Sequence, residues 1–227
     1  MNAVAFYSNT GQSRSVAEYF AEQLSYPIIN IENSSDDHYE NLVLVFPVHC
    51  QNVPDIVKAF LKTTKIKNLT VIATYGRMCC GNVLREIQNR YRQSIVAAAY
   101  VPTKHSYLAQ DSAFSDYDKL RPIVEKIKTP AAIILPRLYK NPLANLFPKW
   151  RSRVGLKIFK NANCNGCNAC GENCPLKAIC EGVPSSECIR CLKCVTACPR
   201  HALEIKIRLP LKLYLRKKKS DQLIIYT

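Results

Sequence analysis

Short apolar runs alternate with amphipathic segments along the first 128 residues. Continuous apolar runs are typical of strands buried on both faces of a parallel sheet, and apolar residues recurring every three to four positions are typical of helices. The predicted strands are Ala3–Tyr7, Pro27–Ile31, Leu42–Val48, Thr70–Tyr75 and Ser94–Val101. The predicted helices are the segment with Val16, Phe20 and Leu24, then Pro54–Leu61, Asn82–Tyr91 and Tyr117–Lys128. This alternation predicts a doubly wound α/β domain with five parallel strands in the order 2-1-3-4-5.

The remaining chain is organised differently. Residues 131–160 combine repeated prolines with apolar residues such as Leu138, Leu146, Phe147 and Trp150, which predicts a packed linker. The tail, residues 207–227, holds the sequence LPLKLYLRKKK, whose alternating leucines at 209, 211, 213 and 215 favour an edge strand over a helix. We therefore expect four parts: an α/β domain over 1–130, the linker over 131–160, a small cysteine-rich α+β domain over 161–206, and the tail. The predicted alternation of strands and helices is least regular at Asn33–Glu40. This segment should hold the second helix but is short and polar.

Eight of the twelve cysteines form two copies of the pattern Cys-x-x-Cys-x-x-Cys-x-x-x-Cys-Pro. A thiolate at every third residue lets one tight loop direct three sulfurs at an iron–sulfur cubane, and in two-cluster ferredoxins the fourth cysteine binds the other cluster. The alternative is structural zinc, which usually takes separated Cys-x-x-Cys pairs. We expect two [4Fe–4S] clusters. The first would be bound by Cys164, Cys167, Cys170 and Cys198, and the second by Cys188, Cys191, Cys194 and Cys174.

Charge and composition limit the possible binding partners and the cellular compartment. The net charge is +15, with 17 Lys/Arg and 12 Asp/Glu in residues 1–150 but 15 and 5 in residues 151–227. No apolar run is long enough for a membrane span, and the N-terminus lacks the features of a secretory signal. We expect a cytoplasmic protein, because thiols stay reduced there. The cluster motifs also suggest a host poor in oxygen.

The loop after the first predicted strand is a candidate phosphate cradle. It has hydroxyl side chains, a glycine that permits close backbone approach, and a helix N-terminus. It contains no lysine, so it is not a Walker A loop, and the chain has no Gly-x-Gly-x-x-Gly fingerprint. Such a turn alone is often a helix cap, but its position after strand one favours phosphate binding.

With these motifs the chain resembles the flavodoxin–ferredoxin fusion proteins of anaerobic bacteria and archaea, up to about residue 205. The resemblance rests on the phosphate loop, on Phe46-Pro47-Val48, on Ala73-Thr74-Tyr75-Gly76 with Gly81, and on the doubled cysteine motif. It implies a flavodoxin-like first domain that binds FMN. The phosphate would be held by Ser8, Asn9, Thr10, Gly11, Gln12 and Ser13. The isoalloxazine would lie between Pro47, Val48 and His49 on one side and Thr74, Tyr75, Gly76 and Gly81 on the other.

The chain departs from the family pattern where an aromatic residue usually follows Pro-Val. Here His49 could stack on the flavin, donate to it, or simply occupy an exposed loop. Cys50, Cys79 and Cys80 fall near the expected flavin, either as a redox-active group or, as we favour, as small inert residues. Cys180 is expected to be a packing cysteine, and Tyr107 is a weaker candidate for flavin contact.

These features predict an electron-transfer flavoprotein that links one-electron cluster chemistry to two-electron flavin chemistry. Two alternatives stay open: a flavin-dependent reductase of a small acceptor such as a quinone or nitro compound, and a carrier with no substrate. Small ferredoxins and flavodoxins are typically acidic, so the basic chain suits docking to one of them, or contact of its tail with an anionic membrane surface. Nucleic acid ranks last, because no aromatic-rich platform accompanies the basic tail.

Overall fold

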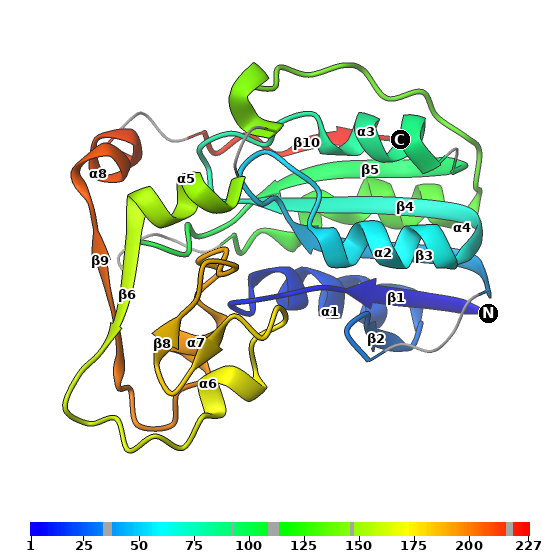
Figure 1. Cartoon of the computed structure of the whole chain (residues 1–227). Coiled ribbons are helices and arrows are strands. Elements are labelled where there is room, and N and C mark those ends of the chain that lie inside the picture. Colours follow the sequence, from blue (N-terminus) through cyan, green and yellow to red (C-terminus); the bar gives the residue numbers. More distant parts are fainter. Residues whose placement is uncertain (34–37, 92, 109–113, 146–147, 217–219) are drawn as a thin grey trace. The chain divides into compact units, whose positions relative to one another are not determined.

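A computed structural model of the chain describes residues 1–33, 38–91, 93–108, 114–145, 148–216 and 220–227 (Figure 1). The chain divides into two compact units. The first comprises Met1–Pro142 with Lys219–Thr227, and the second comprises Leu143–Lys218. The second unit is therefore an insertion in the chain of the first. Residues 34–37 of the expected second-helix segment Asn33–Glu40, the linker residues Leu146 and Phe147, and the basic run 217–219 lie outside the described residues. The end of that expected helix, His38–Glu40, is instead the start of a strand.

The first unit is built on a six-stranded, mostly parallel sheet, which confirms the expected α/β architecture. The strand order is β10-β5-β4-β3-β1-β2, in which β1 to β5 are parallel to their neighbours and β10 pairs antiparallel with β5. The strands are β1 (Asn2–Phe6), β2 (Ile28–Asn30), β3 (His38–Pro47), β4 (Lys65–Tyr75), β5 (Ile95–Pro102) and β10 (Ile224–Tyr226). The helices are α1 (Gln12–Leu24), α2 (Asp55–Thr63), α3 (Val83–Tyr91), η1 (Tyr117–Leu120) and α4 (Arg121–Lys128).

Two hydrophobic clusters, one on each face, hold helices to this sheet. Alternation along β3 shows the division, because Leu42, Leu44 and Phe46 belong to one cluster while Val43 and Val45 belong to the other. The first cluster adds residues of α2, α3 and the segment after α4: Val57, Phe60, Val83, Ile87 and Leu135. The second adds residues of α1 and α4: Val16, Phe20, Ile123, Val124 and Ile127. The carboxyl ends of the parallel strands, where their loops gather, form the edge at which ligands bind in such sheets.

The second unit consists of short elements around the cysteine motifs. Strands β6 (Leu156–Lys160) and β9 (Leu203–Ile207) pair antiparallel, as do β7 (Ile179–Cys180) and β8 (Val183–Pro184). Its helices are η2 (Pro142–Asn145), α5 (Pro148–Gly155), α6 (Ala169–Glu172), α7 (Lys193–Thr196) and α8 (Leu209–Leu215). Among the described residues, no helix combines the length and apolar character needed to span a membrane.

The tail differs from the sequence expectation in two ways. The leucine alternation predicted an edge strand, but Leu209–Leu215 is helix α8. Leu211 and Leu215 are also four residues apart, and on the helix Leu215 is buried while Leu211 packs where a side chain at Gly155 would lie. The edge strand is instead β10, which extends the predicted five-stranded sheet to six.

The linker is also divided differently from the expected range 131–160. Its first part belongs to the first unit, where Leu135 is 1% exposed and Ile133 and Leu138 pack against the same core. Its second part belongs to the unit that carries the cysteines. The segment therefore has apolar residues because it completes the cores of both units.

Candidate functional site

The eight motif cysteines line two separate cavities of the second unit. Each cavity measures about 320 Å³, counted with the solvent at its mouth. The first is lined by Cys164, Cys167, Cys170 and Cys198, and the second by Cys174, Cys188, Cys191 and Cys194. Each set takes three cysteines from one motif and the last cysteine from the other motif. The structure thus brings together the same two groups of four that the two-cluster ferredoxin pattern predicts.

The two motifs fold as copies of one backbone. Three pairs of residues 24 positions apart have matching left-handed conformations: Gly166 and Arg190 (φ 76° and 60°), Asn168 and Leu192 (φ 56° and 66°), and Lys177 and His201 (φ 48° in both). Helices α6 and α7 have the same spacing. Left-handed residues other than glycine are uncommon and mark positions that the surrounding structure constrains. Their repetition indicates that the loops are shaped to direct the cysteines.

Backbone N–H groups donate to the sulfurs in a pattern that follows the repeat. The Ala178 N–H donates to Cys174 Sγ at 3.2 Å, and the Ala202 N–H donates to Cys198 Sγ at 3.3 Å. Gly182 adds a third such bond, to Cys170 Sγ at 3.3 Å. Hydrogen bonds to cysteine sulfur stabilise the thiolate form and are one means by which a protein sets the potential of an iron–sulfur cluster.

The cavities differ in character. The second has mostly apolar walls, and burial raises the pKa of the Cys191 thiol to about 11 and that of Cys194 to about 12. The first includes Glu181 and Arg200, and the Ala202 N–H lowers the pKa of Cys198. Cysteine must lose its proton to bind metal, so a bound cation offsets the cost of forming thiolates in the apolar cavity.

The arrangement of the cysteines does not favour the alternative of structural zinc. Within the part of the chain that the structure describes, no three or more His, Cys, Asp and Glu side chains are arranged to hold a single metal ion. Two cavities with four sulfurs on their walls suit a larger inorganic group than one ion. The donor set therefore fits [4Fe–4S] clusters.

The loop between β1 and α1 is suited to an anion. Helix α1 begins after Gly11, whose φ of 89° requires the left-handed region, and no side chain caps its first turn. That turn also contains no acidic residue. Ser8 Oγ is buried and has no hydrogen-bond partner in this structure. Uncapped N–H groups beside a buried hydroxyl fit a phosphate such as that of FMN.

Two polar pairs tie this loop to neighbouring strand ends. Ser13 Oγ and Thr74 Oγ1 are 2.8 Å apart and buried, so both hydroxyls are engaged with each other. Asn9 Nδ2 lies 2.9 Å from His49 Nε2. Burial lowers the pKa of His49 to about 4, so the imidazole is neutral and Nε2 accepts from the amide. These pairs therefore join the loop after β1 and the start of α1 to the loop after β3 and the end of β4.

The loop after β4 lies in close contact with its neighbours on both sides. A Cβ at Gly81 would come within 2.8 Å of the Gln51 carbonyl oxygen, and one at Gly76 within 2.7 Å of the His105 imidazole. His105 is a residue of this edge that the sequence did not identify, because no motif marks the loop after β5. Tyr75 is 4% exposed and its hydroxyl donates to the Gln222 carbonyl at 2.6 Å, so only its backbone borders the edge.

The remaining cysteines have separate environments. Cys50 is exposed in the loop after β3, while Cys80 packs against the core and burial raises the pKa of its thiol to about 11. A raised pKa favours the inert thiol and supports a packing role for Cys80. Cys180 was expected to pack but is exposed, because alternation along β7 buries Ile179 and turns Cys180 outward. Tyr107 is partly buried with its ring 5.1 Å from that of His105.

Comparison with known proteins gives one family match. Residues 183–204, which contain the four cysteines of the second motif, match the family described as a 4Fe-4S binding domain. This match supports at least one [4Fe–4S] cluster in the second unit. No curated protein matches the chain.

Two solved structures are similar to part of the chain. A protein assigned as a flavoprotein from Bacteroides uniformis has a TM-score of 0.40 and 16% identity, over 47% of this chain and 92% of that chain. The Trp repressor binding protein from Bacillus subtilis has a TM-score of 0.36 and 12% identity, over 60% of this chain and 100% of that chain. With TM-scores this low, neither likeness bears on function.

Proposed function

We propose that this chain is an electron-transfer protein that holds one FMN in the first unit and two [4Fe–4S] clusters in the second. The observation that carries the proposal is the crossed grouping of the cysteines, in which each cavity takes three sulfurs from one motif and one from the other. That arrangement is the one by which two-cluster ferredoxins bind their clusters.

The FMN part of the proposal relies on the strand-end loops. Ser8 Oγ and the N–H groups at the start of α1 would hold the phosphate, with Asn9, Thr10 and Gln12 in the same loop. Pro47, Val48 and His49 would border one side of the ring, and the backbone of Thr74–Gly76 with Gly81 the other. Bound FMN can take two electrons and pass them singly or as a hydride, whereas each cluster carries one electron.

Side-chain and backbone groups of this chain set the polarity around the proposed flavin and the proposed clusters. The neutral His49 imidazole places a polar but uncharged group at the flavin edge, held by Asn9. The three N–H to sulfur bonds stabilise thiolate charge at the clusters.

A stoichiometric reductive titration tests the function. Under anaerobic conditions the full chain should take up about four electrons, two in flavin bands and two in cluster bands. Cluster bands that bleach without any flavin bands would contradict the FMN assignment. Turnover with quinones or nitro compounds well above that of generic dyes would favour the reductase alternative.

We further propose an acidic one-electron carrier as the redox partner. Helix α8 exposes Leu209 (67%) and Leu213 (53%), and Arg208, Lys212 and Arg216 accompany them. Apolar residues surrounded by cations suit a carrier with a negative docking face. In each encounter one electron would leave the carrier, oxidising it, and enter a cluster. The second-order rate constant with a reduced acidic ferredoxin should fall steeply with added salt, whereas a rate independent of salt would contradict this docking mode.

A further inference from the structure

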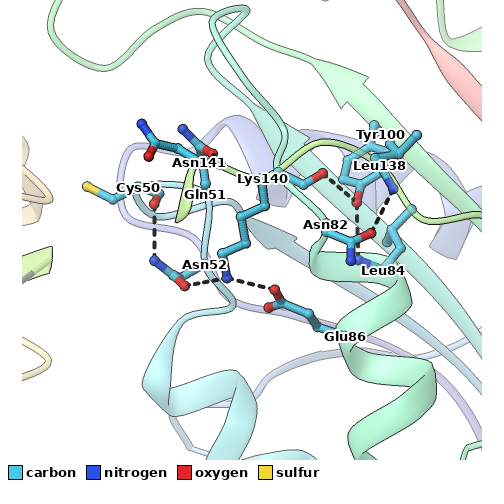
Figure 2. Close-up of polar contacts among 11 residues, drawn as sticks. Cys50, Gln51, Asn52, Asn82, Leu84, Glu86, Tyr100, Leu138, Lys140 and Asn141 are labelled. Carbon is cyan, nitrogen blue, oxygen red and sulfur yellow. Dashed lines mark hydrogen bonds and ion pairs between the residues drawn. The ribbon is translucent and has the colours of Figure 1, made fainter. Parts of the chain in front are cut away.

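Both chain connections to the second unit are fastened to loops of the proposed flavin site. The chain leaves the first unit after Pro142 and re-enters it at Lys219. The residues just before the exit contact the loop after β3, and those just after the return contact the start of the loop after β4 (Figure 2 shows the first of these). All these contacts lie within the first unit.

The exit anchor is centred on Lys140. Its Nζ donates to Asn52 Oδ1 at 2.8 Å and pairs with Glu86 Oε1 of α3 at 2.7 Å. The Lys140 side chain is 13% exposed and that of Glu86 36%, so this ion pair is more shielded than an ordinary surface pair. The Asn141 N–H donates to Gln51 Oε1 at 2.9 Å. Figure 2 shows Lys140 reaching from the connecting segment to both partners.

The turn held by this anchor is strained. His49 and Asn52 exchange backbone hydrogen bonds of 3.0 and 2.8 Å around two central residues, Cys50 and Gln51, with φ of 49° and 68°. Such two-residue turns favour glycine or asparagine, because positive φ is energetically costly for other residues. Close packing against Gly81 and the Lys140 contact oppose this cost. The turn is the same one that presents His49 to the flavin edge.

The return anchor involves Tyr75 and Arg77. The Tyr75 hydroxyl donates to the Gln222 carbonyl at 2.6 Å, and the Ser220 N–H donates to the Arg77 carbonyl at 2.6 Å. The Arg77 side chain, 15% exposed, forms an ion pair with Asp221. Arg77 itself is left-handed, with φ of 60°. The start of the second flavin-site loop is thus held by the chain as it returns.

We propose that these two connections are anchors that position the flavin-site loops, with Lys140 and Asp221 as positioning residues. Loss of an anchor would release its loop from the strained conformation and weaken flavin binding. The ligand part of this inference depends on the proposed function, whereas the loop part does not. As a consequence, the segment that leads into the cluster unit and the segment that leads out of it each contact a loop of the proposed flavin site.

The test uses the full chain with its clusters and with flavin removed. Variants Lys140→Met and Asp221→Asn would be compared by hydrogen exchange of residues 48–53 and 76–82 and by FMN titration. Lys140→Met should speed exchange in 48–53 and raise the FMN dissociation constant about tenfold. Asp221→Asn should speed exchange in 76–82 with a smaller change in affinity, because Asp221 is 64% exposed.

Three controls separate positioning from general damage. Lys67→Met removes the exposed Lys67–Glu40 pair from the far end of the sheet and should change neither readout. Lys140→Arg keeps the charge and should restore most of the affinity. If Lys140→Met does not fold, Glu86→Gln removes the same ion pair while preserving shape, and should give the same local increase in exchange.

The outcomes are distinguishable. Unchanged exchange in both loops of folded Lys140→Met and Asp221→Asn would overturn the anchor proposal. Faster exchange throughout the first unit, with no excess at 48–53, would also overturn it. If the wild-type chain binds no FMN, the proposed function fails in its flavin part, and the exchange data still decide whether the anchors hold the loops.

Discussion

Replacement of His49 by Asn should remove a pH-dependent part of the stability. Burial beside Tyr7 lowers the pKa of the His49 imidazole from 6.5 to about 4, because desolvation disfavours the charged ring more than the nearby Asp55 carboxylate favours it. The unfolded chain therefore takes up a proton near pH 6.5 that the folded chain refuses until near pH 4. The stabilising contribution is complete above pH 6.5 and is lost as the pH falls toward 4. Between pH 7.5 and 5.5 the loss is about 1.4 kcal/mol.

The assay is urea unfolding of the flavin-free chain at both pH values, followed by circular dichroism. His49→Asn should lose about 1.4 kcal/mol less unfolding free energy than the wild type between pH 7.5 and 5.5, whatever its stability at pH 7.5. Other histidines contribute equally to both proteins and cancel. Equal losses in the two proteins would refute the assignment of a buried neutral imidazole at the flavin edge.

Three further predictions concern the two sites. Cys198→Ala should abolish the cluster bound mainly by the first motif and leave the other cluster in place. Iron content should therefore fall by about half, and one cluster signal should vanish from the electron paramagnetic resonance spectrum of the reduced protein. Loss of the second motif's cluster instead would contradict the crossed grouping. Gly81→Ala should destabilise the first unit by about 2–3 kcal/mol and Gly11→Ala by only about 1, because both need positive φ but only Gly81 has a carbonyl oxygen 2.8 Å from the new Cβ. Equal unfolding midpoints for these two variants would contradict the close approach of residue 81 to the Gln51 carbonyl oxygen. Ser13→Ala should cost about 1–2 kcal/mol in urea unfolding by breaking a buried hydroxyl pair, and no change would argue against that pair.

The main elements of the first unit follow from the sequence because burial imposes simple periods. Strand β3 is apolar on both faces, so its residues form one continuous run that admits no amphipathic helix. The hydrophobic pattern does not distinguish a strand from a helix where the same residues fit both periods. Leucines at alternate positions in 209–215 include pairs four apart, and packing of Leu211 at Gly155 decides for the helix.

Other features depend on tertiary contacts that no local pattern encodes. Strand β10 is three residues long and pairs with β5 only after the whole cluster-bearing unit has been traversed. His105 gains its place through contact with Gly76, and the role of Lys140 depends on Asn52, 88 residues earlier in the chain. The cysteine grouping was predictable because the doubled motif matches that of two-cluster ferredoxins, in which the last cysteine of each motif binds the other cluster. The FMN ligands themselves stay a prediction.

The central claim is that one chain holds two [4Fe–4S] clusters and one FMN, and quantification of all three components tests it most directly. The protein would be purified anaerobically and analysed for iron, acid-labile sulfide, zinc and flavin. We expect about eight iron atoms, about eight sulfides and about one FMN per chain. About two zinc ions without iron would contradict the cluster assignment, and full iron without flavin would contradict the assignment of the first unit.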